Sequence, residues 1–272
     1  MLARGGSATD AAIAVMLALG VVEPQSSGIG GGGFMVRGTA DGSVGTFDGR
    51  ETAPSSATPD WFLDENGQLP PFIESVRSGL SVGVPGNIAL AAKAHAAYGK
   101  LPWASLFEPA IKLARQGFEM NPRLIGMLES ARNRSAHSAQ ARSIFFDAEG
   151  QPLPVGTVVK NEQLAQTLET IARGGRAAFY SGDTARAIAT TVASDTPHTD
   201  AMTYSDVTSY NAKARDAVCG SYREYRVCTM GPPTSGGVAV LQMLGQLERF
   251  DLAEMGLRNP RTWHLFVESQ RL

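Results

Sequence analysis

The sequence predicts a helix-rich α+β fold in one continuous domain. A helix that is apolar on every side follows Ser7, and two short apolar stretches flank the turn dipeptide Asp41-Gly42, which is typical of a strand hairpin. No internal repeat or low-complexity linker divides the 272 residues, which are enough to bury a sizeable core. Helices and hairpin strands therefore share one layered core.

The first helix has a clear start signal. Ser7 is a candidate N-cap, and Asp10 three residues later has capping-box spacing. Because the helix is apolar all round, we expect both of its faces to be covered, in an inner layer of the fold. We expect Gly20 to end it, and we predict strands at 33–38 and 43–49.

The remaining elements follow from periodicity and from glycine, proline and asparagine signals. The pattern predicts a strand and a turn at 75–86, a helix at 87–99, two short helices at 101–118, helical structure at 120–145, a loop at 148–159, helices at 161–175 and 181–194, a turn at 196–200, a hairpin at 217–230 and a turn followed by a buried helix at 232–250.

Both ends of the sequence suggest a piece of something longer, so we expect residues 1–272 to be a single domain truncated at both ends. The longest apolar run starts at Ala11, and twelve helical residues reach roughly 18 Å, short of the ~30 Å hydrocarbon core of a bilayer. We therefore expect no membrane span in this segment. A net charge of −2 gives no basic excess for nucleic acid.

The glycine stretch at 28–33 has the spacing G-x-G-x-x-G through Gly28, Gly30 and Gly33. A dinucleotide-binding loop needs a strand before the glycines and a helix after them, but here a helix precedes and a strand follows. A P-loop lysine is also absent. The remaining alternatives are a flexible surface loop, or a main chain kept bare so that another segment or a substrate can approach closely.

Ser81 lies in "GLSVG", which matches the nucleophile-elbow pattern of serine hydrolases. An elbow requires a helix to begin at once, whereas Val84-Pro85-Gly86 intervenes. Asp251 and His264 are the only loosely placed triad partners. The four histidines are scattered and the two cysteines are too few for a structural zinc site, so we expect no metal and no cofactor.

Arg50 stands at the end of a predicted strand, in "FDGRETAP". A guanidinium in that place can grip a carboxylate with two parallel hydrogen bonds. The alternative is a surface arginine paired with Glu51 or Asp48.

Cys219 and Cys228 lie in the predicted hairpin at 217–230. If Arg223 and Glu224 form its two-residue turn, the cysteines lie directly opposite each other, within disulfide reach. Arg-Glu is a poor two-residue turn, so a disulfide and two buried thiols both stay open.

Several stretches in order resemble the γ-glutamyltransferases, also called glutathione hydrolases. They are "GGSATDAAIAVMLALGVVEPQSSGIGGGGFMV", "FDGRETAP", "GVPGNIALAAKAHAAYGKLPWASLFEPAIKLARQGF", "GGRAAFYSGDTARAI", "YREYRVCTMGPPTSGGVAVLQML" and "LERFDL". The resemblance covers Gly5 to Leu272 and no single short motif carries it. It implies an N-terminal-nucleophile hydrolase with an αββα sandwich, of which this chain would be the helix-rich large-subunit portion.

The resemblance also implies where the chemistry lies. The nucleophilic Thr begins a small subunit cut from the same precursor, so we expect no catalytic residue in this chain. Arg50 corresponds to the arginine that binds the α-carboxylate of the γ-glutamyl group in this family. Structural residues near the site would be Gly30, Gly31, Gly32, Gly33, Ser235 and Gly236.

The family further implies glutathione as substrate, the small subunit as obligatory partner, autoproteolysis of a zymogen, and a periplasmic or secreted location. A related cephalosporin-type or polyglutamate-type acylase stays an alternative, and a non-catalytic homologue is another. We expect side chains at positions 30–33 to obstruct packing or subunit closure.

Overall fold

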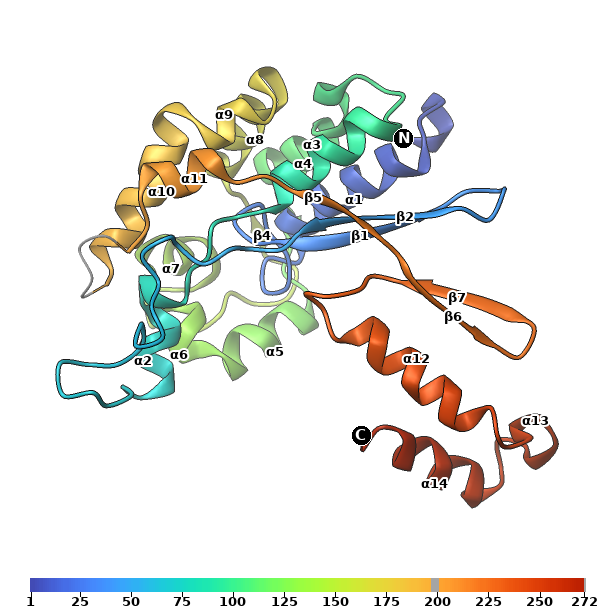
Figure 1. The fold of residues 1–272 in the computed structure, drawn as a ribbon. Coiled ribbons are helices and arrows are strands. Elements are labelled where there is room, and N and C mark those ends of the chain that lie inside the picture. The colour runs from blue at the N-terminus through green and yellow to red at the C-terminus, as the bar shows by residue number, and fades with distance from the viewer. Residues whose placement is uncertain (197–200, 272) are drawn as a thin grey trace. The chain divides into compact units, whose positions relative to one another are not determined.

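The computed structural model describes residues 1–196 and 201–271. The chain divides into two compact units (Figure 1). Unit 1 consists of Met1–Gly33 and Gly49–Ala212, and unit 2 consists of Phe34–Asp48 and Lys213–Leu272. The prediction of one domain stays a prediction.

Unit 1 is mainly helical. Its helices are α1 (Ala8–Val22), α2 (Phe72–Arg77), α3 (Asn87–Tyr98), α4 (Glu108–Gln116), α5 (Pro122–Ser130), α6 (Arg132–Ser135), α7 (Ala139–Phe145), α8 (Glu162–Gly174), α9 (Ala177–Tyr180), α10 (Gly182–Ser194) and α11 (Tyr204–Ser209), with short 3₁₀ helices at Leu2–Arg4, Gly79–Ser81 and Trp103–Leu106. Two short strands, β3 (Phe118–Glu119) and β4 (Val158–Val159), pair antiparallel. The predicted turn at 196–200 lies mostly outside the described residues.

The core of unit 1 lies between its long helices. Among the completely or almost completely buried apolar side chains are those that α1, α3, α8 and the 3₁₀ turn before α4 contribute: Ile13, Leu17, Ile88, Leu106, Leu168 and Ile171. A second cluster joins α5 to β4 and contains Met120, Leu124, Leu128, Phe146 and Val159. The predicted helices at 87–99, 101–118, 120–145, 161–175 and 181–194 are confirmed.

Helix α1 begins as predicted and ends later. Ser7 and Asp10 form the capping box, but the helix continues through Gly20 to Val22, so the predicted stop at Gly20 is wrong. Gly20 instead lies close to Gly28, where an added Cβ would be 3.4 Å from the Gly28 Cα. Coverage of both faces is not found among the described residues, because Val15 is 56% exposed.

The prediction of a strand in 75–86 is wrong. Residues 72–81 form α2 and a 3₁₀ turn, and the Ser78 side chain caps that turn by accepting a hydrogen bond from the Leu80 N–H. The Gly79 N–H donates to the Asp195 carbonyl at 2.8 Å. This packing against the end of α10 overrides the strand preference of the valines in the segment.

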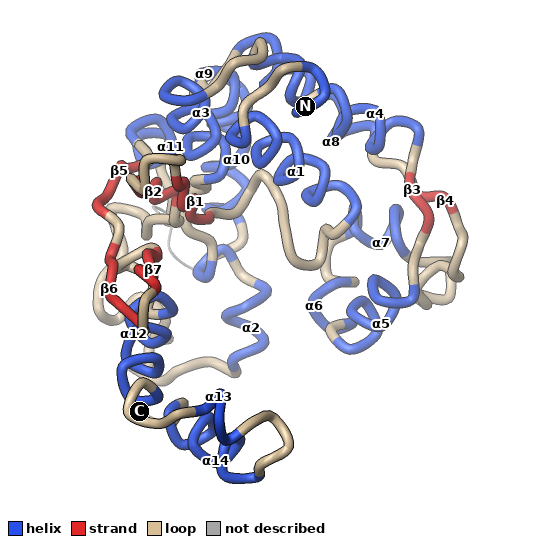
Figure 2. Tube along the Cα trace, turned by 90° about the vertical axis from the view of Figure 1, so that its right-hand side faces the viewer, coloured by secondary structure: helices blue, strands red, loops and turns tan. Residues whose placement is uncertain are grey.

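Unit 2 contains most of the sheet structure (Figure 2). Its elements are β1 (Gly33–Gly38), β2 (Val44–Gly49), β5 (Lys213–Asp216), β6 (Val218–Tyr222), β7 (Tyr225–Thr229), α12 (Gly236–Leu247), α13 (Leu252–Met255) and α14 (Pro260–Ser269). The end residues Gly33 and Gly49 belong to unit 1. The three-stranded sheet has the order β1-β2-β5, and β6 pairs with β7.

Both predicted hairpins are confirmed. The Thr39 N–H donates to the Ser43 carbonyl at 3.0 Å, and Gly42 has φ 82°, as a turn at Asp41-Gly42 requires. In the second hairpin Tyr222 pairs with Tyr225, so Arg223 and Glu224 form the turn. Arg223 takes the unusual φ of 54°, and its N–H donates to the Glu248 carboxylate at 2.7 Å.

The helices of unit 2 leave apolar side chains in solvent. The prediction that the helix at 232–250 is buried is wrong for the described residues, because only Gly237 and Leu247 of α12 are buried. Val240 on α12 and Trp263, Phe266 and Val267 on α14 are exposed. Among the residues that the structure describes, we find no helix with the length and apolar character needed to cross a membrane.

Candidate substrate-binding site around Arg50

Arg50 directly follows β2 and lies in unit 1. Its side chain is 54% exposed, and its Nε lies 3.6 Å from Glu51 Oε2. Asp48, the other partner considered from the sequence, instead pairs with Arg215, with 2.7 Å between Oδ2 and Nε. The Arg50 side chain is thus about half exposed and forms an ion pair with Glu51.

The main chain of Arg50 is fixed although its side chain is exposed. The Tyr210 hydroxyl donates to the Arg50 carbonyl at 2.7 Å. The Tyr210 ring stacks on Tyr180, with 5.8 Å between the centroids and 11° between the planes. Arg176 lies 4.7 Å from the centroid of the Tyr180 ring and also donates to the Tyr210 carbonyl. This stack anchors the point from which the Arg50 side chain extends.

Tyr180 connects the stack to the start of α3. Its hydroxyl donates to the Pro85 carbonyl at 2.7 Å and accepts from the Ala89 N–H at 3.3 Å. Burial raises the pKa of Tyr180 well above its usual value, with a smaller lowering contribution from the Ala89 N–H. The phenol therefore stays protonated at neutral pH and acts as a fixed structural donor.

Three main-chain segments cross beside Arg50, and we call Gly31, Gly32, Gly49 and Gly86 the glycine crossing. The Gly31 carbonyl accepts hydrogen bonds from the N–H groups of Gly86 and Asn87, both at 3.0 Å. A Cβ on Gly32 would lie 2.5 Å from the Gly49 carbonyl oxygen, and a Cβ on Gly86 only 1.9 Å from it. Backbone packs directly on backbone here, as the absence of side chains permits.

The glycines at 30–33 differ in how much space surrounds them. A Cβ on Gly30 would meet no atom within 4 Å, and one on Gly31 would make only ordinary contacts, the nearest at 3.5 Å to Glu51. A Cβ on Gly33 would lie 3.1 Å from Asn87 Oδ1. None of the four is among the described glycines with positive φ. The geometry therefore makes Gly32, whose Cβ would approach a main-chain oxygen, the most restricted of the four.

Asn87 and Tyr210 belong to this site but were not found from the sequence. The Asn87 Nδ2 donates to the Gly28 carbonyl at 2.7 Å and thereby ties the glycine stretch to the first turn of α3. Asn87 is recognisable in the sequence only as a residue near a helix start, and Tyr210 has no local signal.

Ser235 and Gly236 lie at the start of α12 in unit 2. Ser235 is the N-cap residue but its side chain makes no capping hydrogen bond. The Gly236 N–H donates to the Thr234 hydroxyl at 3.4 Å. Their assignment near the site stays a prediction.

The serine-hydrolase alternative lacks its structural context. Ser81 ends a 3₁₀ turn that follows α2, not a strand, and the next helix, α3, begins only at Asn87. Its hydroxyl donates to the carbonyls of Val76 and Ser78, both at 3.2 Å. Among the described residues, no three His, Cys, Asp or Glu side chains are arranged to hold a metal ion.

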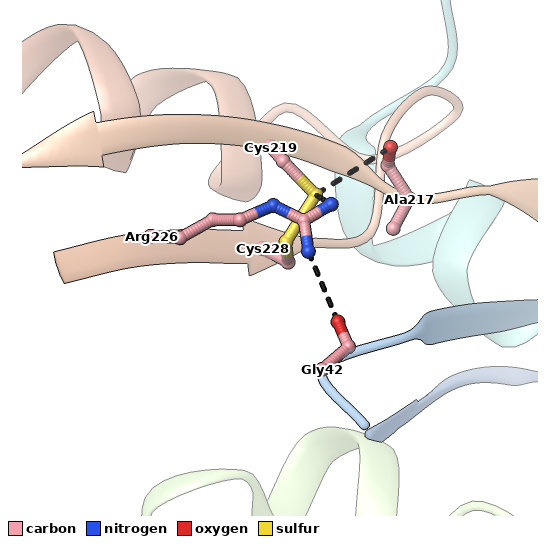
Figure 3. Close-up of a disulfide and its surroundings, with 5 residues drawn as sticks. All are labelled: Gly42, Ala217, Cys219, Arg226 and Cys228. Carbon is pink, nitrogen blue, oxygen red and sulfur yellow. Dashed lines mark hydrogen bonds between the residues drawn. A yellow bond between two sulfur atoms is a disulfide. The ribbon is translucent and has the colours of Figure 1, made fainter. Parts of the chain in front are cut away.

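Cys219 and Cys228 are joined by a disulfide across β6 and β7 (Figure 3). They are a directly opposed pair in the register, with Cα atoms 4.1 Å apart. Arg226 of β7 lies beside the disulfide, with Nη2 3.3 Å from Cys219 Sγ, and its Nη1 donates to the Gly42 carbonyl at 3.0 Å.

The comparisons with known proteins point to one family. The family model described as gamma-glutamyltranspeptidase matches residues 1–272. A glutathione hydrolase proenzyme of Bacillus subtilis (strain 168) is 38% identical over 275 residues, covering 100% of this chain and 46% of that protein. The glutathione hydrolase proenzyme of Escherichia coli (strain K12) is 36% identical over 271 residues, with coverage of 100% and 46%. The chain thus spans less than half the length of these relatives.

Solved structures agree with the sequence relatives. The gamma-glutamyltranspeptidase of Helicobacter pylori matches with a TM-score of 0.92 at 36% identity, over 99% of this chain and 76% of that chain. A cephalosporin acylase of Bacillus halodurans matches with a TM-score of 0.84 at 28% identity, over 100% of this chain and 50% of that chain. The predicted α+β fold, part of the αββα sandwich of N-terminal-nucleophile hydrolases, is confirmed.

Proposed function

The chain belongs to the gamma-glutamyltranspeptidase family, and from this premise we propose that the protein transfers or hydrolyses the γ-glutamyl group of glutathione and other γ-glutamyl amides. The reaction runs through an acyl-enzyme on the N-terminal Thr of a small subunit that is cut from the same precursor and completes the enzyme. The names of the two proenzyme relatives support a precursor, and the share of their length that this chain spans leaves room for a second subunit.

Arg50 is the residue of this chain that we assign to the substrate. The partial exposure of its side chain, its place at the end of β2 and its anchored main chain support this role. Two parallel N–H groups of the guanidinium bind the α-carboxylate of the γ-glutamyl group. Because that carboxylate is remote from the scissile amide, Arg50 orients the substrate and is not itself a proton donor or nucleophile.

We also propose a periplasmic or secreted location. The disulfide between Cys219 and Cys228 supports it, since such bonds persist in oxidising compartments and are rare in the cytosol.

Replacing Arg50 by Lys in the complete gene product tests the assignment. The variant keeps the charge but loses the bidentate geometry, so we expect kcat/KM for a γ-glutamyl anilide to fall by about 10- to 100-fold, equivalent to ~1.5–3 kcal/mol of charged hydrogen bonding. Arg4→Lys is the matched control, because Arg4 is also exposed in unit 1 and paired with a glutamate, Glu108. Equal kcat/KM values for Arg50→Lys and wild type would contradict the assignment.

The likeness to a cephalosporin acylase supports a second candidate, an acylase that acts on other amides. A butyryl anilide distinguishes the two, because its acyl chain corresponds to the γ-glutamyl group without the α-carboxylate and the α-amine. A γ-glutamyl enzyme should prefer the γ-glutamyl anilide, and Arg50→Lys should reduce that preference while leaving the butyryl reaction unchanged. A wild-type protein that prefers the butyryl anilide would favour the acylase.

A further inference from the structure

Strand pairing in the β6–β7 hairpin holds Cys219 and Cys228 opposite each other in addition to the disulfide bond. The ladder pairs Val218 with Thr229 on one side of the cysteines and Gly220 with Val227 on the other. The Arg223 N–H at the turn donates to Glu248, just after α12. The two sulfur atoms would therefore stay neighbours after the disulfide is opened.

The disulfide is open to solvent on one side. Cys219 is exposed and Cys228 is partly exposed. Figure 3 shows the Arg226 guanidinium lying against the sulfur pair, between the disulfide and Gly42. One guanidinium nitrogen is held by the Gly42 carbonyl, and the other lies 3.3 Å from Cys219 Sγ. A fixed positive charge at that distance stabilises a thiolate on Cys219 more than one on Cys228.

We propose that Cys219–Cys228 is a thiol–disulfide exchange site for a small-molecule thiol. The thiolate of the small molecule attacks Cys228 Sγ, a new sulfur–sulfur bond forms there, and the bond to Cys219 breaks. Cys219 leaves as a thiolate beside Arg226, because the sulfur whose thiolate is more stable is the better leaving group. The step exchanges one disulfide for a mixed disulfide and transfers no net electrons.

The hairpin makes the exchange reversible. The Cys219 thiolate stays opposite the mixed disulfide on Cys228 and can attack it, which expels the small thiol and restores the original bond. A second molecule of thiol can instead attack the small-molecule sulfur of the mixed disulfide. That attack releases the oxidised small-molecule disulfide and leaves both cysteines reduced. This site is independent of the proposed γ-glutamyl chemistry.

The test uses the complete gene product and 2-mercaptoethanol. This thiol carries no charge other than that of its reactive thiolate and no γ-glutamyl group, so γ-glutamyl hydrolysis does not affect the result. Samples are alkylated at successive times and the cysteine peptides are identified by mass spectrometry. We expect the mixed disulfide on Cys228 and the alkyl group on Cys219. The mixed disulfide on Cys219, or no exchange at millimolar thiol, would overturn the proposal.

Arg226→Gln tests the role of the guanidinium. We expect exchange to slow by roughly threefold or more, because the leaving thiolate loses its cation. Arg258→Gln is the matched control, since Arg258 is an exposed arginine of unit 2 and the charge change is the same. Near-ultraviolet circular dichroism checks that both variants keep their fold. An Arg226→Gln variant that exchanges as fast as wild type, or faster, would overturn the proposal.

Discussion

Unit 1 and unit 2 are held together in different ways. Around Arg50, unit 1 packs main chain on main chain through the glycine crossing. Among the described residues of unit 2, only Phe47, Met230 and Leu247 are buried apolar side chains. Unit 2 instead relies on strand ladders, local hydrogen bonds and the disulfide, and its helices leave apolar side chains exposed.

This difference predicts where the addition of a single methyl group destabilises the protein. A region in which backbone contacts backbone cannot accept even one methyl group, because no side chain can move aside. An open helix face can accept one without cost. The same type of substitution should therefore have opposite effects in the two units.

The largest effect is expected from Gly86→Ala. Its Cβ would lie 1.9 Å from the Gly49 carbonyl oxygen and 2.4 Å from the Tyr210 hydroxyl. We expect the free energy of unfolding to fall by about 3 kcal/mol or more, as for severe overpacking. Gly245→Ala in α12 is the control in unit 2, because a Cβ there would meet no atom within 4 Å. Urea unfolding of both variants measures the difference.

Gly245→Ala should leave stability unchanged or raise it by up to about 1 kcal/mol, since alanine favours a helix over glycine. The comparison between the units would fail if the two variants were equally stable.

A second expected difference concerns buried charge. Asp10 in unit 1 is fully buried, and its Oδ2 accepts hydrogen bonds from the N–H groups of Ser7, Lys100 and Leu101 at 2.7, 3.0 and 3.3 Å. Burial raises the pKa of Asp10, but these hydrogen bonds and one from the Ser7 hydroxyl outweigh it, so the pKa lies below its ordinary value. Asp10→Asn removes the charge and should cost about 2 kcal/mol at pH 7.

The stability lost in Asp10→Asn should depend on pH and should be smaller in acid. Because the pKa is lower in the folded protein, the stabilisation by Asp10 is present above the unfolded value of about 3.9 and is lost as the pH falls through the folded value. The stability difference between wild type and Asp10→Asn should therefore shrink in acid. Asp251→Asn in unit 2 is the control, because Asp251 is exposed and caps α13 through the Glu254 N–H, and asparagine caps equally well. A difference that grows below pH 4 would contradict this account.

Local signals explain what could be predicted from the sequence. The capping box of Ser7 and Asp10, the turn at Asp41-Gly42 and the hairpin that places the cysteines opposite each other each depend on residues close together in the chain. Arg50 stands out at a strand end, and the family resemblance supplies its proposed partner. These features need no knowledge of the tertiary structure.

The parts that could not be predicted depend on contacts between distant residues. The first part of the strand expected at 75–86 is helical through Ser81, because Gly79 packs against the end of α10, more than a hundred residues later. The hydrogen bond from Tyr210 to Arg50 joins residues 160 positions apart. The glycine stretch suggested a main chain that another segment approaches closely. Only the fold shows that this segment contains Gly49, which Gly86 also approaches.

The smallest effect, and the one that connects the crossing to function, is expected from Tyr210→Phe. The variant keeps a ring that can stack on Tyr180 but leaves the Arg50 carbonyl without the hydroxyl donor, which should cost about 1 kcal/mol of stability. If this hydrogen bond positions Arg50 for the α-carboxylate, KM for a γ-glutamyl anilide should rise a few-fold while kcat stays near the wild-type value, because the lost binding is common to ground and transition states. Tyr225→Phe on the exposed hairpin of unit 2 should change neither constant. A Tyr210→Phe variant with lower stability and an unchanged KM would show that the crossing supports the fold around Arg50 without setting the position of its guanidinium.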